Sequence, residues 1–554
     1  MVNQNNASIL EAYSVKVTRM ARHMQDGSYY KGVIFPTPDG ESSEHFIPNE
    51  VVHDTRKLLN YLSRNGMTQP ADKKERAKLL EAIGLAEPAD RCSLTIMTGW
   101  HGRTYVLPHK SISRDQSDDI RYFGALAPNA EAGSLDNWKD EVAKPLAASS
   151  IGVFTVVAAL MPIIAHMTNC ENAIFHISGK SGVGKTTLAR VAASVWPGGH
   201  ASLANWDSTP SGLQDLMASS NDGFASLDEF SASASDNRAQ RKFLREVTYM
   251  LATGSTRRRS KHYSGGADVQ KYRFLALSTG ESTAASIAAL AGEERMLGEE
   301  ARFLDLPIED SPTGIFDLLA ETEHRSTQKQ AAQLADNLNV TTTQYFGTAA
   351  PAFIRYVVDN FDKVELLVKE RVALFNKKLN VPSTGWERRI SNKFGLAYAV
   401  GVLAIDAGIL PWSKVLVKDS AVTAYGLARS HLFTEADRLN DALEKLQATA
   451  KAAPIVDLTE PPVPEVSIVN AAPALRMRQN GKTVRILVNV AAFNTIGDTA
   501  VRDNLIGKLD LAGVVLKKHT TARPTSAQVT PIKGARRQSY MCFTRKLLKF
   551  ELPN

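Results

Sequence analysis

Cysteine is scarce in this 554-residue sequence. The three cysteines, Cys92, Cys170 and Cys542, lie far apart and show none of the paired spacings that bind a metal. This arrangement predicts a reducing compartment and argues against a zinc site. The first ten residues, MVNQNNASIL, also lack the basic and apolar regions of a signal peptide, so we expect a cytoplasmic protein.

Long apolar runs are scarce as well, and the one that stands out is short. The stretch from Ile151 to Ala165 has 15 residues without a charge, whereas a membrane-spanning helix needs about 20. It contains Pro162 and is followed directly by His166. We therefore expect a buried core helix here, and no membrane partner.

Positive charge is concentrated at the end of the chain. The formal net charge is +7, but residues 471–554 hold 15 Lys and Arg against 4 Asp and Glu, a net of +11. The first 470 residues therefore sum to −4. A basic block behind a slightly acidic body indicates a polyanionic partner, with a merely solvated basic surface as the alternative.

The chain is too long for one hydrophobic core, and roughly three or four domains are expected. The fold class is α/β, because short apolar runs at 173–177, 223–227, 272–277 and 302–306 alternate with helical stretches. This pattern predicts a parallel sheet with helices on both faces. The expected divisions are a small β-containing domain at 1–125, the α/β core at 126–315, a helical region at 316–450, a proline-rich linker at 451–466 and a basic domain at 467–554.

A glycine-rich loop follows the first of these apolar runs. Residues 179–186, GKSGVGKT, fit G-x-x-x-x-G-K-[ST] at every fixed position. Backbone N–H groups and the helix N-terminus of such a loop hold phosphates, Lys185 reaches the β- and γ-phosphates, and Thr186 ligates Mg²⁺. The predicted cofactors are therefore ATP and Mg²⁺. The predicted nucleotide contacts are Gly179, Ser181, Gly182, Val183, Gly184, Lys185, Thr186 and Thr187.

The second apolar run ends in two adjacent carboxylates, Asp228 and Glu229, in the sequence DGFASLDEF. A carboxylate at a strand end can hold Mg²⁺ through its water shell, and the next one can act as general base on the attacking water. Taken alone, such a pair is often a solvated turn. Its position after the phosphate loop favours Asp228 as a metal residue and Glu229 as the base.

The last two runs supply further candidates for catalysis. The sequence YRFLALSTGE ends in Ser278 and Thr279, which could contact the γ-phosphate or the attacking water, with ordinary turn chemistry as the alternative. Arg302 lies just before an apolar run in GEEARFLDLP. In a ring ATPase an arginine there stabilises charge on a neighbouring subunit's γ-phosphate. The alternative is a surface arginine paired with Glu299 or Glu300.

These four elements, in this order and spacing, resemble the AAA+ ATPase superfamily. The finer resemblance is to the family called domain of unknown function 927, whose members are labelled superfamily 3-like or MCM-like helicases of mobile elements and phages. It spans roughly residues 15–415 and includes TGWHGRTYVLP, GKSGVGKTT, LSTGE and RRISNKFGLAYAVGVLAIDAGILPW. The resemblance implies a ring-forming motor with an N-terminal domain, an AAA+ core and a helical lid.

The resemblance also implies a role for each candidate residue. Ser278 or Thr279 takes the sensor 1 place, where asparagine is commoner in the superfamily. The other implied assignments are Lys185 and Thr186 in the Walker A motif, Asp228 and Glu229 in the Walker B motif, Arg302 as the arginine finger, and Arg389 as the second sensor with Arg388 as its competitor.

A basic segment lies between the second and third apolar runs, in TGSTRRRSKHYSGG. In an extended hairpin Arg257, Arg259 and Lys261 project from one face, with Arg258 between them. Such a hairpin would point into the pore of an MCM-like ring, where cations bind backbone phosphates without reading sequence. An exposed basic loop is the alternative.

The terminal basic block resembles a winged helix. ALRMRQNGKTVRILV suggests two strands around a turn, and TAVRDNLIGKLDLAG suggests a helix that Asp498 can cap. Arg502 and Lys508 point away from the apolar face of that helix. The segment GARRQSYMCFTRK, with Arg536 and Arg537, could form the wing. Such a domain could contact DNA or dock on the ring.

Together these features predict an ATP-dependent, ring-forming DNA helicase or translocase. We expect a homohexamer that acts on single-stranded or forked DNA and serves replication of a mobile element. Two other classes remain open: a nucleotide-switched DNA-binding initiator or helicase modulator without unwinding activity, and an AAA+ remodeller of a protein partner. No metal-carboxylate or zinc pattern in the sequence supports priming.

Overall fold

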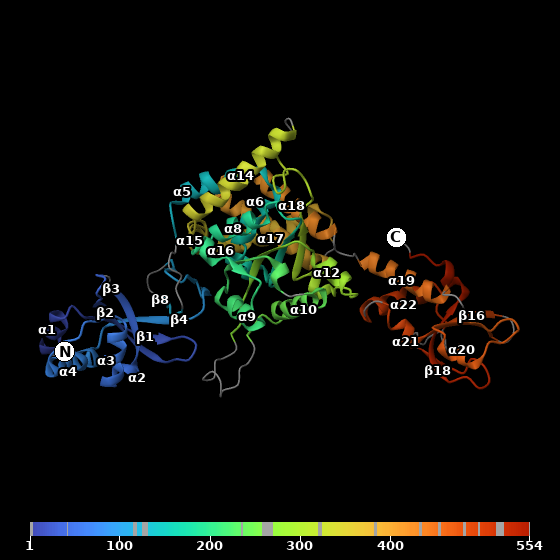
Figure 1. Cartoon of the computed structure of the whole chain (residues 1–554), viewed down its shortest axis with the longest axis horizontal. Helices are drawn as coiled ribbons and strands as arrows, with labels where there is room; N and C mark the ends of the chain where they lie inside the picture. Colours follow the sequence, from blue (N-terminus) through green and yellow to red (C-terminus); the bar gives the residue numbers. More distant parts are fainter. Residues whose placement is uncertain are drawn as a thin grey trace. The chain divides into compact units, whose positions relative to one another are not determined.

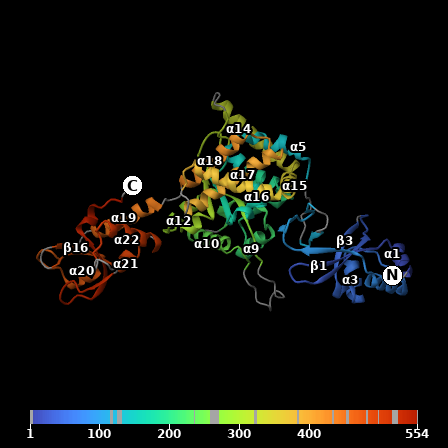
Figure 2. The ribbon, with the colours of Figure 1, turned by 180° about the vertical axis from the view of Figure 1, so that it is seen from behind.

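The computed structural model describes most of the chain as two compact units, Met1–Ala428 and Arg429–Asn554. The described residues are 4–40, 42–114, 119–124, 131–233, 236–256, 270–319, 324–381, 385–430, 435–451, 456–479, 483–496, 499–516 and 526–552. Figure 1 shows the elements of both units from one side and Figure 2 from the opposite side.

The N-terminal part of the first unit is a five-stranded sheet with helices packed against it. β1 pairs antiparallel with β2 and parallel with β4, in the order β3-β2-β1-β4-β8. α3 and α4 share one apolar core with β2 and β3. The elements are α1 (Gln4–Ala12), β1 (Lys16–His23), β2 (Tyr29–Pro36), β3 (Ser42–Pro48), α2 (Asn49–Val52), α3 (Thr55–Arg64), α4 (Lys73–Leu85), β4 (Asp90–Thr95) and β8 (Ile120–Tyr122).

A small sheet of β5 (Gly99–His101), β6 (Thr104–Val106) and β7 (Ser111–Ile112) attaches this part to the central region. The backbone N–H of Trp100 donates to Asp222 Oδ2 at 3.0 Å, and its indole Nε1–H donates to the carbonyl oxygen of Ile163 at 2.8 Å. Asp222 is fully buried and also receives the guanidinium of Arg273. Because Asp222 lies just before β11, this network fixes the start of the strand that ends at Asp228.

The central sheet is parallel throughout, as the apolar runs predict. Its strands are β9 (Ala173–Ser178), β10 (Ala204–Asn205), β11 (Phe224–Asp228), β12 (Leu275–Gly280) and β13 (Phe303–Pro307), in the order β10-β11-β12-β9-β13. Four strands fall on predicted runs, whereas the two-residue β10 is too short to leave a pattern. Since β9 lies between β12 and β13, the loop after β9 emerges between the carboxyl ends of these neighbours.

Helices cover both faces of the central sheet. Ile174 of β9 packs in a core shared with α9, α10 and α12. The next residue, Phe175, points to the other face and contacts Phe154 of α6 and Phe394 of α17. The helices before, between and after these strands are α5 (Leu135–Trp138), α6 (Ser150–Leu160), α7 (Pro162–Ala165), α8 (Lys185–Ser194), α9 (Pro210–Ser219), α10 (Asn237–Thr253), α12 (Ala284–Leu290) and α13 (Leu297–Glu300).

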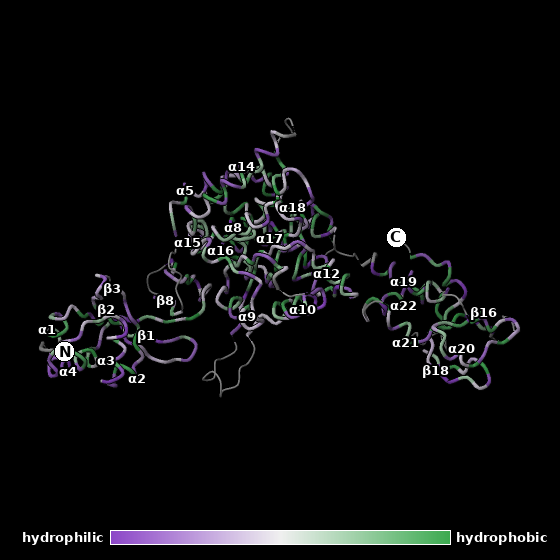
Figure 3. The backbone as a smooth tube through the Cα atoms, in the orientation of Figure 1, coloured by the Kyte–Doolittle hydropathy of each residue, from purple (hydrophilic) through white to green (hydrophobic). Residues whose placement is uncertain are grey.

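The apolar run 151–165 forms α6 and α7, and the prediction of a buried core helix is confirmed. Every residue of α6 is buried. Figure 3 colours the backbone of each unit by hydropathy. Within the described residues, no single helix is long and apolar enough to cross a membrane. Ser150–Leu160 and Pro162–Thr168 together reach the length and apolar composition of a membrane span, but the two helices are bent by 56°. Buried core helices can have the same length and composition.

The helical region after β13 continues the first unit but ends earlier than predicted. α16 and α17 pack against each other, and α17 packs on α6. The helices are α14 (His324–Gln344), α15 (Ala349–Asp359), α16 (Phe361–Lys378), α17 (Trp386–Asp406) and α18 (Lys414–Ser430). The next helix, α19 (Glu435–Lys451), lies in the second unit. Its Leu439, Leu443 and Leu446 are buried there against the sheet and α22, so the predicted region 316–450 is divided near residue 429.

The second unit is a five-stranded sheet in the order β14-β15-β16-β18-β17. Residues 474–479 and 483–489 pair as antiparallel strands, as the sequence predicts, and Val501, Leu505 and Leu509 of α22 point into the core. The elements are β14 (Val456–Asp457), α20 (Val466–Ala471), β15 (Ala474–Gln479), β16 (Thr483–Asn489), α21 (Val490–Phe493), α22 (Thr499–Leu511), β17 (Ala527–Val529) and β18 (Gln538–Thr544).

The segment predicted to form the wing contains β18, an interior strand that pairs with both β16 and β17 and whose Tyr540–Phe543 stretch is buried. The winged-helix assignment of this unit stays a prediction. The described part of the predicted linker is also structured, because Val456 is buried and pairs with Leu475. The proposed capping residue, Asp498, lies outside the described residues.

Candidate nucleotide site

The glycine-rich sequence 179–186, predicted to bind phosphate, forms a tight loop between β9 and α8. β9 ends at Ser178 and α8 begins at Lys185. Gly182 and Gly184 have φ angles of +87° and +101°, a region that side chains with a Cβ rarely adopt. The N-terminus of α8 therefore opens into the loop, where its unpaired N–H groups and its dipole favour an anion.

Lys185 lies folded over the loop. Its Nζ donates hydrogen bonds to the carbonyl oxygens of Gly179 at 2.8 Å and Lys180 at 2.7 Å. Burial lowers the pKa of Lys185, while the carboxylates of Glu281, Glu229 and Asp228 act in the opposite direction. The ammonium group is thus placed among negative groups at the carboxyl end of the sheet.

Asp228, at the end of β11, contacts both α8 and β12. Its Oδ1 lies 3.4 Å from the hydroxyl of Thr186 on α8, and it accepts a hydrogen bond from the hydroxyl of Thr279 at the end of β12. Thr186 and Asp228 are the pair predicted to hold Mg²⁺, and the structure brings them together. In the described part of the chain, no group of three or more His, Cys, Asp or Glu side chains is arranged to bind a metal. A metal here would therefore take other ligands from the phosphates and water.

Glu229 is held in an unusual backbone conformation. Its φ is +62°, a left-handed value that costs about 1–3 kcal/mol for a residue with a side chain. Its N–H donates to Asp228 Oδ1 and to Thr279 Oγ1, both at 3.2 Å, and its carboxylate accepts from Ser231. The side chain is exposed. Two hydrogen bonds thus hold the predicted base in a strained turn beside Asp228, the predicted metal residue.

The structure separates the two candidates at the end of β12. Because successive side chains of a strand point to opposite faces, Thr279 contacts Asp228 whereas Ser278 points away from it. Ser278 is fully buried, accepts from Trp206 Nε1 at 3.0 Å and pairs with His176 Nδ1 at 2.8 Å. The predicted contact with the nucleotide is therefore retained for Thr279 and is wrong for Ser278.

Replacing these two residues separates catalysis from stability. Thr279→Val is expected to lower the ATPase kcat roughly 10- to 100-fold, because a hydrogen bond to a charged group contributes about 1.5–3 kcal/mol. Ser278→Ala removes the hydrogen-bond partner of Trp206 Nε1 and of His176 Nδ1, so it should lower the melting temperature and leave kcat almost unchanged. ATPase kinetics and thermal melts of both variants check this, and equal kcat losses would contradict it.

Arg302 lies at the opposite edge of the sheet from the phosphate loop. It comes just before β13, and its carbonyl oxygen accepts from the N–H of Ile174 at the start of β9. Its Nη1 donates to the carbonyl oxygen of Gly298 at 2.8 Å. β9 has six residues, so Arg302 is roughly 20 Å from the loop of its own chain. No ion pair joins Arg302 to Glu299 or Glu300 among the described residues.

Arg389 lies at the same edge as Arg302. Its guanidinium makes a two-pronged contact of 2.8 and 3.3 Å with the carboxylate of Glu171, just before β9. Burial alone would raise the pKa of Glu171, but the hydrogen bond from Arg389 and the charges of Lys393, Arg389 and Arg302 lower it. Glu171 and the fully buried Lys393 were not identified from the sequence, which carries no motif at either position.

The predicted DNA contacts are only partly described. Arg257, Arg258, Arg259 and Lys261 lie outside the described residues. Arg502 and Lys508 are on α22, where Arg502 donates to the carbonyl oxygen of Asn494 at 2.9 Å. Arg536 and Arg537 are exposed in the turn before β18. The four described cations therefore lie on two elements of the second unit.

Two comparisons with known proteins found a match to this chain. Residues 3–270 match the model of a family described as "Domain of unknown function (DUF927)". The chain is similar to a solved structure titled "SCCmec type IV Cch - active helicase", with a TM-score of 0.67 and 15% sequence identity, covering 97% of this chain and 95% of that chain. The two proteins therefore share a fold along almost their full length. No curated protein matches the sequence.

Proposed function

We propose that this protein is an ATP-driven DNA helicase with an AAA+ core, in which each active site forms between two copies of the chain. ATP binds on the loop 179–186, Mg²⁺ is held at Thr186 and Asp228, and Glu229 activates water. Contacts of Asp228 with Thr186 and Thr279 support this site. The helicase title of the similar structure supports the activity.

The observation that carries the proposal is the position of Arg302 and Arg389. Both arginines lie at the amino edge of the central sheet, while the phosphate loop lies at the carboxyl edge. An arginine roughly 20 Å away cannot stabilise the γ-phosphate of its own chain. Arg302 therefore acts on the nucleotide of a neighbouring copy, with Arg389 beside it, and repetition of this contact closes a ring. A homohexamer that serves replication of a mobile element is the assembly and setting we propose.

DNA is the proposed substrate because of the basic second unit and the segment 257–261. The net charge of +11 in residues 471–554 favours a phosphate backbone. Single-stranded or forked DNA would pass through the ring, with Arg257, Arg259 and Lys261 following one strand. The second unit binds the same DNA through Arg502, Lys508, Arg536 and Arg537.

Strand displacement on a forked duplex tests this function. Unwinding is expected with ATP and not with a non-hydrolysable analogue, and single-stranded DNA should stimulate the ATPase. DNA binding with slow ATPase and no unwinding would favour a nucleotide-switched initiator instead. ATPase activity that DNA does not change but a protein partner stimulates would favour an AAA+ remodeller of that partner.

Salt dependence tests the basic turn of the second unit. Arg536→Gln with Arg537→Gln is expected to reduce the slope of log K against log salt for single-stranded DNA by about 1.4, since each phosphate contact contributes about 0.7. Replacing Lys73 and Lys74, two exposed cations on α4, by Gln is the matched control and should leave the slope unchanged. If the two double variants show the same salt dependence of DNA binding, the DNA does not contact Arg536 and Arg537.

A further inference from the structure

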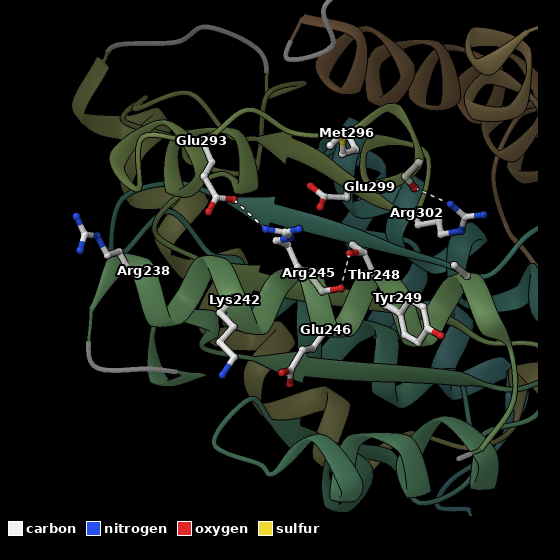
Figure 4. Close-up of a pocket in the computed structure, with 12 residues that line it drawn as sticks. Arg238, Lys242, Arg245, Glu246, Thr248, Tyr249, Glu293, Met296, Glu299 and Arg302 are labelled. Carbon is white, nitrogen blue, oxygen red and sulfur yellow. Dashed lines mark hydrogen bonds and ion pairs between the residues drawn. The ribbon is translucent and has the colours of Figure 1, made fainter. Parts of the chain in front are cut away.

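A pocket of about 660 Å³ opens beside Arg302, between α10 and the segment 293–302 (Figure 4). Its α10 wall comprises Glu246, Thr248, Ala252 and four further residues, Arg238, Lys242, Arg245 and Tyr249. Their spacing of four, three and four residues places them on one face of the helix. All four side chains are exposed. The pocket therefore lines up three cations and an aromatic ring beside the predicted arginine finger.

The carboxylates on the other wall, Glu293 and Glu299, form ion pairs with arginines of α10. The buried guanidinium of Arg241 contacts Glu293 at 3.0 Å and Glu299 at 2.8 Å, and Arg245 lies 3.5 Å from Glu293. Among the residues that the structure describes, no carboxylate forms an ion pair with Arg238 or Lys242. This surface therefore offers positive charge to a partner.

The pocket also exposes large apolar side chains. Tyr249 is 65% exposed and Met296 is 55% exposed, although both line the concavity. Aromatic side chains and methionine are enriched at the centres of protein interfaces, where tyrosine often carries much of the binding energy. Cations around an exposed aromatic anchor fit a protein surface better than a bare phosphate chain.

The opposite edge of the same sheet carries the complementary charge. Glu281 and Glu309 are exposed and follow β12 and β13, the two strands that flank β9. Glu229 is exposed beside them, and Asp310 forms an ion pair with Lys180. The edge that holds the phosphate loop is thus rimmed by carboxylates, and a bound nucleotide adds further negative charge.

We infer that the α10 pocket is the docking surface for the phosphate-loop edge of a second copy of this chain. Arg238 and Lys242 face the carboxylates Glu281 and Glu309 of that copy, and Tyr249 is the apolar anchor. The inference rests on the proposed function, because Arg302 in the same pocket needs a neighbour's nucleotide. It goes beyond that function by assigning the residues that hold the two copies in register.

A charge exchange between the two surfaces tests the inference on the full chain. The first variant, Arg238→Glu with Lys242→Glu, makes the pocket acidic, and the second, Glu281→Lys with Glu309→Lys, makes the opposite edge basic. Each alone brings like charges together, so association in the presence of Mg²⁺ and a non-hydrolysable ATP analogue should weaken at least tenfold. An equimolar mixture pairs every reversed surface with its complement and should restore association as alternating copies.

Sedimentation velocity across a concentration series measures these outcomes. Tyr249→Ala should also weaken association at least tenfold, whereas Tyr29→Ala, a similarly exposed tyrosine of the N-terminal sheet, should not. Nucleotide binding by the first variant should remain, which shows that it is folded. Unchanged association of the single variants, or no recovery in the mixture, would overturn the inference. A loss of DNA affinity with unchanged association would overturn it too and assign Arg238 and Lys242 to DNA binding.

The same data separate this inference from the proposed function. Wild-type protein that associates and hydrolyses ATP, with variants that associate equally well, contradicts only the assigned docking residues. Wild-type protein that neither associates nor hydrolyses ATP contradicts the proposed function itself.

Discussion

Glu229→Gln is expected to bind ATP with almost unchanged affinity and to lose about 10²–10⁴ of its turnover, the contribution of a positioned general base. The amide keeps the size of the side chain and the backbone hydrogen bonds of residue 229 to Asp228 and Thr279, so only the proton acceptor is lost. The variant should therefore accumulate in a nucleotide-bound assembly. ATP binding and steady-state ATPase, measured on the same preparation, check this.

Glu81→Gln is the matched control, because Glu81 is an exposed carboxylate of α4 with no assigned part in the site or the docking surface. Its turnover should stay close to that of the wild type. Normal turnover in Glu229→Gln would remove Glu229 from the mechanism, and equal losses in both variants would show that the loss does not come from the general base.

Arg302→Ala is expected to lower ATP turnover by about 10³–10⁵, the range that an arginine finger contributes. Nucleotide binding should persist, because Arg302 lies at the other edge of the sheet from Lys185 and Thr186. Arg56→Ala, at an exposed arginine of α3, provides the control and should hydrolyse ATP normally. If Arg302→Ala keeps full turnover, Arg302 is not an arginine finger, and the proposal that the active site forms between two copies loses its main argument.

The parts of the fold that could be predicted are those with strong local patterns. The four longer strands of the central sheet and the buried helix at 150–160 follow from continuous apolar runs. The sequence did not identify β18 as an interior strand, since only four of its residues, Tyr540–Phe543, are buried and polar residues flank them. The helix α19 was assigned to the wrong unit, since amphipathic periodicity shows that a face is buried but not which core receives it.

In the candidate site, too, the features that could be predicted are those with a local sequence pattern. The glycine loop, Lys185, Thr186 and Asp228 follow from short motifs in which spacing reflects chemistry. The choice between Ser278 and Thr279 depends on which of the two side chains lies on the same face of the sheet as Asp228, and adjacent polar residues give no such information. The contact between Arg389 and Glu171, 218 residues apart, arises from packing of α17 near the start of β9 and has no local signature.

The most direct test of an active site shared between copies is ATPase of a mixture of Arg302→Ala and Lys185→Ala. Each variant alone is expected to be nearly inactive, because one lacks the finger and the other lacks the phosphate cation at every interface. In the mixture, some interfaces join the intact loop of an Arg302→Ala copy to the intact arginine of a Lys185→Ala copy, and turnover should partly return as the two are titrated. A mixture that stays inactive while its mass shows that the two variants have co-assembled would contradict the account, and so would a protein that stays monomeric at every ATP and DNA concentration.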